Sequence, residues 1–520
     1  MRFVRNLILL CVAICTPIAM LGCAAVDARP DYDRAAELIT SATGEPEAQP
    51  LDDESIRAST RDAMLQDGLT LDEVVKLALL NNPAMAVQFF EIGIARADLV
   101  QSGLFSNPTF GLSVQFPEGG GRSNLQASLA QNIVDLWQIP VKKEIASRNL
   151  EAAILRVADT AVQIAARART AFFVAVGARQ ALAIAHENVA LAERLLVVTE
   201  IRKQAGALGD LDVNLARGGL LDAQIEVLRA ALTGAEADAD LAAVLGIRTS
   251  LMDVPLSTPL PVPPEVALNP DAIIELAFNS RLDLRAAMMS VDAAEQQVLL
   301  EIREVIPTFQ LGLAFERLER RSPPDRNLLA DFNRATLANQ QFSMPSFQTN
   351  AERSADRSAE IDAILGPSLS VTLPLFDQNQ AQIARARFLF DQEIRRLESM
   401  EISAIQSVRK ALAAAQANWN IARSFARDVV PQAVRNLDLS RESYRAGRSS
   451  LITVLDSRRE LLKSRRNYVA ALQSAAESVA ELERATARPI SEILTRAGKS
   501  IPSTQPAEPG PTQQPERNSP

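Results

Sequence analysis

The sequence predicts a mostly α-helical protein with membrane β-strands, in which long antiparallel helical coiled coils form an α-barrel and short strands form part of a β-barrel. Three observations predict this fold class: heptad patterns over long proline-free stretches, strands with one apolar and one polar face, and an internal repeat that contains both. Residues 366–380 join the two kinds of segment. Leu369, Val371 and Leu373 alternate with polar residues, and a helical pattern begins at Gln380.

Composition excludes several classes of protein. Alanine and leucine dominate while aromatic residues make up only 4%, which favours long helices. The net charge of −9 and the scattered basic residues argue against a nucleic-acid partner. The three cysteines lie within the first 23 residues and His186 is the single histidine. We therefore expect no enzyme active site, no cofactor and no metal site, with His186 on an exposed helix face.

The N-terminus resembles a bacterial export signal. Two arginines precede an apolar stretch at residues 6–19 that is too short to span a bilayer comfortably. Residues 20–23, Met-Leu-Gly-Cys, resemble the lipobox of lipoproteins, which implies a signal peptide at residues 1–22 and a lipid on Cys23. Ordinary cleavage near Ala24 or Ala25, without a lipid, is the alternative. Ala24 in place of Asp implies, by the same resemblance, sorting to the outer membrane.

An internal repeat organises the rest of the chain. Pro108-Thr-Phe110 recurs as Pro307-Thr-Phe309, 199 residues later, and Gly206 matches Gly447, 241 residues later. Because the second separation is larger than the first, the second repeat contains an insertion between these two matches. The inserted residues are polar and include prolines, as is typical of surface loops. The expected organisation is a leader at 23–66, extended or disordered, a first repeat at 67–249, a linker at 250–266, a second repeat at 267–488 with an inserted extracellular loop at 316–365, and a disordered tail at 489–520.

Each repeat contains two strands with alternating apolar and polar residues. The first strands start at Phe110 and Phe309, and the returning strands lie near residues 125–133 and 369–375. Their lengths suit tilted strands that cross a bilayer. Four strands cannot close a barrel, and an unpaired edge in lipid leaves backbone groups without hydrogen bonds. We therefore expect a homotrimer with a 12-stranded transmembrane barrel in outer membrane lipid.

The helical stretches carry apolar residues at alternating spacings of three and four. The stripe covers Leu150 to Val189 in the first repeat and Ile405 to Val429 in the second. A helix over residues 136–204 would be about 100 Å long at 1.5 Å per residue. Pro431 predicts a kink or a break. Heptads alone favour a structural coiled coil, and only their combination with amphipathic strands and an export signal favours a conduit.

Residues 69–488 resemble the TolC-like outer membrane efflux proteins, specifically outer membrane factor lipoproteins. The resemblance is carried by Leu77-Ala-Leu-Leu-Asn-Asn-Pro83, Leu373-Pro-Leu-Phe-Asp377 and, most specifically, Tyr444-Arg-Ala-Gly-Arg-Ser-Ser-Leu-Ile-Thr-Val-Leu-Asp456 followed by Arg458. It implies an outer membrane trimer with a periplasmic helical tube, which docks onto a periplasmic adaptor protein of an inner-membrane pump and passively conducts what the pump delivers.

The turns between the paired long helices are the expected site. Glycine suits both turns, because a side chain hinders a left-handed residue. The resemblance implies that these turns face the adaptor. The expected adaptor contacts at these helix tips are Gly206, Gly447, Arg445, Arg448, Ser449 and Ser450.

The resemblance also implies a periplasmic gate. Asp212 and Asp456 match gate carboxylates of the family, while Thr453 stands where well-studied members have another carboxylate. Threefold symmetry would gather the aspartates into rings that favour cations and respond to pH. Solvated aspartates near a helix start are the alternative.

One rival function and one open question follow from the sequence. The rival is a non-conducting periplasmic coiled-coil scaffold lipoprotein. The cargo is open: residues 377–380, Asp-Gln-Asn-Gln, resemble the heavy-metal branch of the family, although one histidine and no mature cysteine would leave any metal preference to the pump.

Overall fold

The computed structural model describes residues 25–45, 54–116, 123–266, 268–319, 336–338, 340 and 361–497. The expected signal peptide, the expected lipidation site Cys23 and the last 23 residues of the expected tail therefore lie outside the described residues. The chain forms two compact units. The first contains the described residues of 97–149 and 291–393, and the second contains those of 25–96, 150–290 and 394–497.

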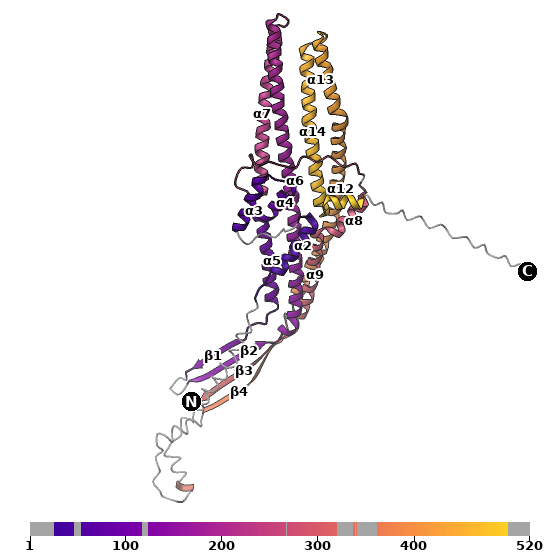
Figure 1. Cartoon of the computed structure of the whole chain (residues 1–520). Helices are drawn as coiled ribbons and strands as arrows, with labels where there is room; N and C mark the ends of the chain where they lie inside the picture. Colours follow the sequence, from indigo (N-terminus) through magenta and orange to yellow (C-terminus); the bar gives the residue numbers. More distant parts are fainter. Residues whose placement is uncertain are drawn as a thin grey trace, which may run out of the picture. The chain divides into compact units, whose positions relative to one another are not determined.

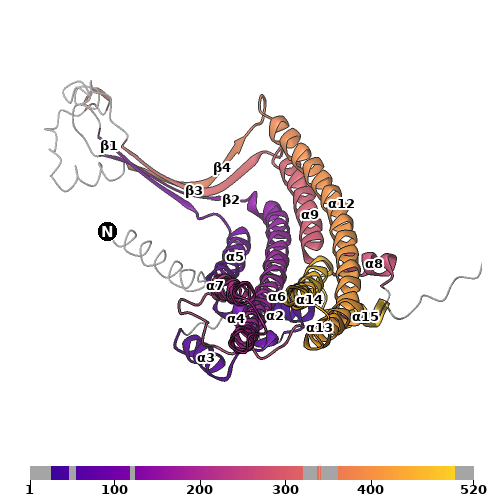
Figure 2. The same cartoon turned by 90° about the horizontal axis from the view of Figure 1, so that it is seen from above.

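The first unit contains an antiparallel sheet of four strands in the order β1-β2-β3-β4, so each strand pairs with its neighbour in sequence (Figure 2). The register places Gly312 of the third strand between Ala130 of the second and Ser368 of the fourth. Both predicted hairpins are confirmed. The strands are β1 Thr109–Gln115, β2 Asn124–Asn132, β3 Thr308–Glu319 and β4 Ile361–Thr372.

The predicted limits of the inserted loop, 316–365, are wrong at both ends. Glu316 pairs with Ile364 and Glu319 pairs with Ile361, so the β3–β4 ladder continues well into the expected loop. The error has a physical cause: ladder hydrogen bonds join backbone groups, and polar side chains do not end them. Strand β4 does end at Thr372, before Pro374, as expected for a residue that lacks a backbone donor.

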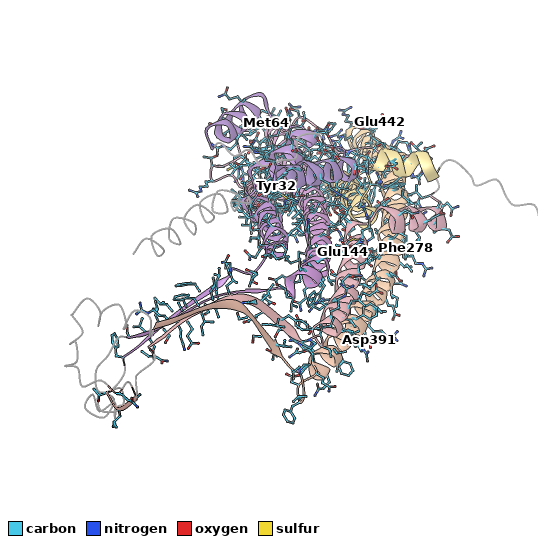
Figure 3. The ribbon with its side chains drawn as sticks, turned by 90° about the horizontal axis from the view of Figure 1, so that it is seen from below. Tyr32, Met64, Glu144, Phe278, Asp391 and Glu442 are labelled. Atoms are coloured by element: carbon cyan, nitrogen blue, oxygen red, sulfur yellow. The ribbon has the colours of Figure 1, made fainter. Side chains whose placement is uncertain are left out.

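The sheet has one apolar and one polar face. Successive side chains alternate between faces, and Figure 3 shows side chains standing on both sides of the strands. On the polar face, Gln126 Nε2 donates a hydrogen bond of 2.8 Å to Glu316 Oε1. The large exposed residues of the apolar face are Phe110, Leu112, Val114, Leu129, Leu311, Leu313, Leu365, Leu369 and Val371.

Specific contacts turn the chain from strand to helix within the first unit. The buried Asp135 begins helix α6 (Asp135–Gln204), and its Oδ2 accepts hydrogen bonds from Ser106 N at 2.8 Å and Ser106 Oγ at 2.5 Å. Asn379 has a φ of +58° just before helix α12 (Gln380–Ser424), and its Nδ2 donates to the backbone oxygen of Glu301 at 2.9 Å. An Asn tolerates this left-handed conformation better than a bulky residue does.

The second unit contains the helical hairpins, with α6 beside α7 and α13 beside α14 (Figure 1). The remaining elements of the chain are α2 Arg29–Thr43, α3 Glu54–Asp67, α4 Leu71–Asn81, α5 Pro83–Ser102, α7 Asp210–Val244, α8 Pro270–Ser280, α9 Leu282–Arg303, the π-helical turn η1 Phe425–Val429, α13 Val430–Arg445, α14 Leu451–Thr486 and α15 Ile490–Ala497.

The predicted leader and tail are wrong where the structure describes them. Residues 29–43 and 54–67 are helical rather than extended or disordered, and residues 490–497 form a helix within the expected tail. In α2, Ala35 and Ile39 are fully buried, and Tyr32 packs edge-on against Phe89 with 5.8 Å between ring centroids. This helix is therefore stabilised by the surface that it covers, which short-range periodicity does not reveal.

The long-helix predictions are largely confirmed. Helix α6 begins one residue before the expected start and ends at Gln204 as expected, and His186 is exposed on it. In the second repeat the apolar stripe fails at Ala426 and Val429, which are exposed. The π-helical turn η1 lies there, where Val430 N–H donates to Phe425 O, directly before Pro431. The proline thus interrupts the α-helix, since it removes a backbone donor.

Helices α6 and α7 are tied together by Arg179. Its guanidinium donates to Asp238 Oδ1 at 2.8 Å, to the carbonyl of Leu251 at 2.7 Å and to the carbonyl of Val254 at 2.6 Å. Asp238 is buried. One arginine therefore satisfies a buried carboxylate and two carbonyls of the linker that follows α7.

A half-buried carboxyl on α6 is expected to make the stability of the second unit pH-dependent. Burial, and next the nearby Asp283, raise the pKa of Asp159, against a hydrogen bond from Gln163 and the charges of Arg281 and Arg484. The folded state therefore holds this proton more tightly than the unfolded state does. The stabilisation from protonated Asp159 is complete below its unfolded pKa and is lost as pH rises through its folded pKa.

Asp159→Asn should remove this pH dependence. An asparagine is neutral throughout, and its side-chain oxygen still accepts from Gln163. The melting temperature of the variant, relative to the wild-type protein in detergent, should therefore rise between pH 4 and pH 7. Asp240→Asn, which removes an exposed carboxylate from α7, is the matched control. A constant difference between Asp159→Asn and the wild type across this range would contradict the assignment.

Candidate functional site

The two turns at the hairpin ends share one backbone design. Gly206 and Gly447 have φ of +74° and +69°, which confirms the predicted left-handed residues. In both turns the next residue donates to the carbonyl five positions earlier at 2.9 Å, from Ala207 to Arg202 and from Arg448 to Ser443. An added Cβ at either glycine would meet no atom within 4 Å. Backbone conformation, rather than crowding, therefore favours glycine there.

The second tip (residues 445–450) presents two unmatched charges. Arg445 and Arg448 are exposed, and neither has an ion pair with another described residue. Ser450 is the N-cap residue of α14, with its Oγ 3.3 Å from Thr453 Oγ1. The Ser449 hydroxyl is buried and has no hydrogen-bond partner in the described part of the chain.

The first tip differs in charge. There Lys203 pairs with Asp210 across the turn, so the two charges compensate each other. The hydrogen bond from Lys203, and next its positive charge, lower the pKa of the Asp210 carboxyl. The second tip is therefore the more cationic of the two.

The predicted gate residues each contact their own hairpin. Asp212 lies in the first turn of α7, where its Oδ2 accepts from Gly209 N at 3.3 Å. Asp456 is exposed and lies 3.7 Å from Arg459. Thr453 is exposed. The single chain does not join Asp212 to Asp456, although Arg459 also contacts Asp222 of α7 at 3.6 Å.

Sequence reasoning missed a row of arginines on α14 that contacts the other hairpin. Two neighbouring pairs, seven residues apart, share one helix face. Arg459 and Arg465 contact Asp222 and Glu187 at 3.6 and 3.5 Å, while Arg466 pairs with Glu226 and Arg458 donates to Asn188. The seven-residue spacing of these pairs was the available signal. We call Arg458, Arg459, Arg465 and Arg466 the arginine row.

Arg458 differs from its counterpart in the first repeat. Arg217, 241 residues earlier, is exposed and lies 3.5 Å from Glu200 of its own hairpin. The position that matches Glu200 in the second repeat holds Arg441. Burial, and next the charge of Arg441, lower the pKa of Arg458 to about 10. Without a local acid, Arg458 bonds to the backbone and side-chain oxygens of Asn188 on α6.

A cation–π contact joins the hairpins nearer their tips. The Arg202 guanidinium on α6 lies 4.8 Å from the ring centre of Tyr444 on α13. Such contacts contribute about 0.5–1 kcal/mol at exposed sites. Together with the arginine row, it links the two hairpins of one chain along their length.

Among the residues that the structure describes, no group of three or more His, Cys, Asp or Glu could hold a metal ion. Likewise, no helix within the described ranges is both long and apolar enough to cross a membrane.

The sequence is similar to one protein family and to individual bacterial proteins. Residues 273–488 match the family described as Outer membrane efflux protein. Protein CyaE of Bordetella pertussis is 28% identical over 308 residues, which are 55% of this chain and 62% of CyaE. The cobalt-zinc-cadmium resistance protein CzcC of Cupriavidus metallidurans is 20% identical over 430 residues, 81% of this chain and 90% of CzcC. The chain thus spans less than two thirds of CyaE but most of CzcC.

The fold is that of solved outer membrane channels. The Campylobacter jejuni CmeC outer membrane channel matches with a TM-score of 0.62 at 17% identity, over 84% of this chain and 92% of CmeC. The open state of the Neisseria gonorrhoeae MtrE outer membrane channel matches with a TM-score of 0.60 at 18% identity, over 80% and 88% of the two chains. The predicted fold class, TolC-like, is thereby confirmed.

Proposed function

We propose that this protein, whose residues 273–488 belong to the outer membrane efflux protein family, is the outer membrane channel of a tripartite efflux system. It conducts substrates passively, after an inner-membrane pump and a periplasmic adaptor deliver them. No bond is made or broken in the channel. The observation that carries this proposal is the amphipathic sheet.

The sheet suits a shared barrel in lipid. Its apolar face carries large exposed side chains, from Phe110 on β1 to Val371 on β4, and its other face is polar. Strands β1 and β4 are the outer strands of the order, and an unpaired edge in lipid costs several kcal/mol per backbone group. Three chains joined edge to edge give twelve strands, with the polar face lining the passage.

The hairpin tips suit the adaptor and the gate. Arg445 and Arg448 provide exposed positive charge at the second tip, and an acidic surface on the adaptor is the complementary partner. In a trimer, Asp212 and Asp456 would form rings that favour cations. Thr453 follows the same turn as Asp456. A lipid on Cys23 would hold the N-terminus of the mature chain in the outer membrane.

Metal cations are the proposed cargo. CzcC and NccC of Alcaligenes xylosoxydans xylosoxydans are named for resistance to cobalt, zinc and cadmium and to nickel, cobalt and cadmium. The residues described here offer no metal cluster. Selectivity would therefore reside in the pump, and the channel would only tolerate cations.

Conduction can be measured directly. The purified full chain, added to planar lipid bilayers, should give discrete conductance steps, and native mass spectrometry in detergent should give the mass of three chains. Both results follow from a barrel that one chain cannot close. A monomer that inserts without conductance would overturn the proposal and leave the scaffold interpretation.

A further inference from the structure

A cavity of about 280 Å³ lies among helices α6, α7 and α14. Asn188, at its α6 side, accepts from Arg458, and Gly219 of α7 is part of its wall. The cavity belongs entirely to the second unit. Its charged lining residues are Arg458, Arg459, Lys463 and Arg466 with Asp222 and Glu226.

The charges of this lining do not balance. Arg459 lies 3.6 Å from Asp222, and Arg466 pairs with Glu226. Among the residues that the structure describes, Arg458 has only the oxygens of Asn188 as partners, and Lys463 makes no ion pair. Two positive charges of the cavity are therefore without a carboxylate.

Arg458 also has a donor without an acceptor. The residue is 8% exposed, and its Nε has no hydrogen-bond partner within the described chain. A terminal nitrogen of the same guanidinium donates to Asn188. No water-sized group reaches this nitrogen in the structure. Buried donors are nearly always satisfied by protein, water or an ion, so a small rotation of the guanidinium toward the cavity would give this N–H an acceptor.

We propose that this cavity binds one small divalent oxoanion of the phosphate or sulfate type. Two negative charges match the two uncompensated cations. A tetrahedral oxoanion offers several acceptors, and guanidinium and ammonium groups are the side chains that recognise such oxygens. A free ion fits a cavity of this size. The inference rests on the cavity alone and does not depend on conduction.

Equilibrium dialysis with radiolabelled inorganic phosphate tests the site. The full chain, purified in detergent without added lipid, should bind about one phosphate per chain saturably. Lys463→Ala should raise the dissociation constant for phosphate about tenfold, since a charge-assisted hydrogen bond is lost. Lys463 is exposed, so the variant should fold, and circular dichroism checks this. Arg458→Lys, which keeps the charge but loses Nε–H, should weaken binding as well.

Two control variants and two competitors complete the design. Lys410→Ala removes an exposed lysine outside the cavity, and Arg217→Ala removes the counterpart of Arg458. Both should bind phosphate as the wild type does. Sulfate should displace phosphate, whereas acetate at equal ionic strength should not. Absence of saturable binding, equal binding by Lys463→Ala, or binding only after lipid is added would overturn the proposal. Bilayer conductance, measured separately, reports on the proposed function and not on this site.

Discussion

Replacing Gly312 by valine is expected to prevent the four-stranded sheet from assembling. A Cβ on Gly312 would overlap the carbonyl oxygen of Leu129 on β2 and lie 2.9 Å from Ser368 Oγ on β4. Real Cβ atoms essentially never come within 3.0 Å of a heavy atom outside their own residue and its two chain neighbours. Neighbouring strands on both sides therefore hold Gly312 at a position without room for a side chain. Overpacking typically costs about 1–3 kcal/mol, and each chain of the proposed trimer would carry it.

The equilibrium constant for sheet assembly should fall about tenfold or more in Gly312→Val, since 1.4 kcal/mol corresponds to a factor of ten, and the amount of protein in the outer membrane fraction should fall with it. Immunoblotting of membrane fractions and the β-sheet signal in circular dichroism measure the effect. Gly366→Val on β4 is the matched control, because no atom lies within 4 Å of a Cβ added there. Normal assembly of Gly312→Val would show that the strands can separate without loss of register.

Arg179→Met is expected to give the largest loss of stability in the helical unit. The substitution leaves the Asp238 carboxylate buried without a cation and removes the donor to the carbonyls of Leu251 and Val254. Loss of one partner of a buried ion pair typically costs about 3–5 kcal/mol. Urea unfolding, followed by the fluorescence of the buried Trp419, measures the loss.

An exposed ion pair provides the control for Arg179→Met. The side chain of Arg395 is 79% exposed and pairs with Glu398 at 2.7 Å, so Arg395→Met should change stability by less than about 1 kcal/mol. The double variant Arg179→Met with Asp238→Leu should recover part of the loss, because no unpaired charge stays buried. Equal stability of Arg179→Met and Arg395→Met would contradict the role of Arg179.

Sequence patterns predicted the helices and turns whose limits depend on neighbouring residues, and missed elements that depend on distant contacts. The heptad stripe indicated one long helix at α6, although this helix contains Pro140 near its start, and two glycines indicated the turns. The helix at residues 29–43 was missed because its burial depends on Phe89 and other distant residues. The start of β4 was missed because it depends on pairing with β3.

The candidate site was only partly predictable for a related reason. Gly206 and Gly447 follow from turn chemistry, which the flanking residues determine. The contact between Arg458 and Asn188 joins residues 270 positions apart. The seven-residue spacing of the arginine pairs indicates a shared helix face, but it does not identify the partner on the other hairpin. What the sequence did contain was a mismatch, with Arg441 where the first repeat has Glu200.

The π-helical turn at Phe425–Val429 affects the far end of the second hairpin. Each α-helical residue advances the side-chain direction by about 100°, and a wider turn interrupts that count. The π-helical turn therefore changes the direction in which every later side chain of α13 leaves the helix. The direction in which the Arg445 side chain leaves α13 is thus set about four turns earlier, beside Pro431.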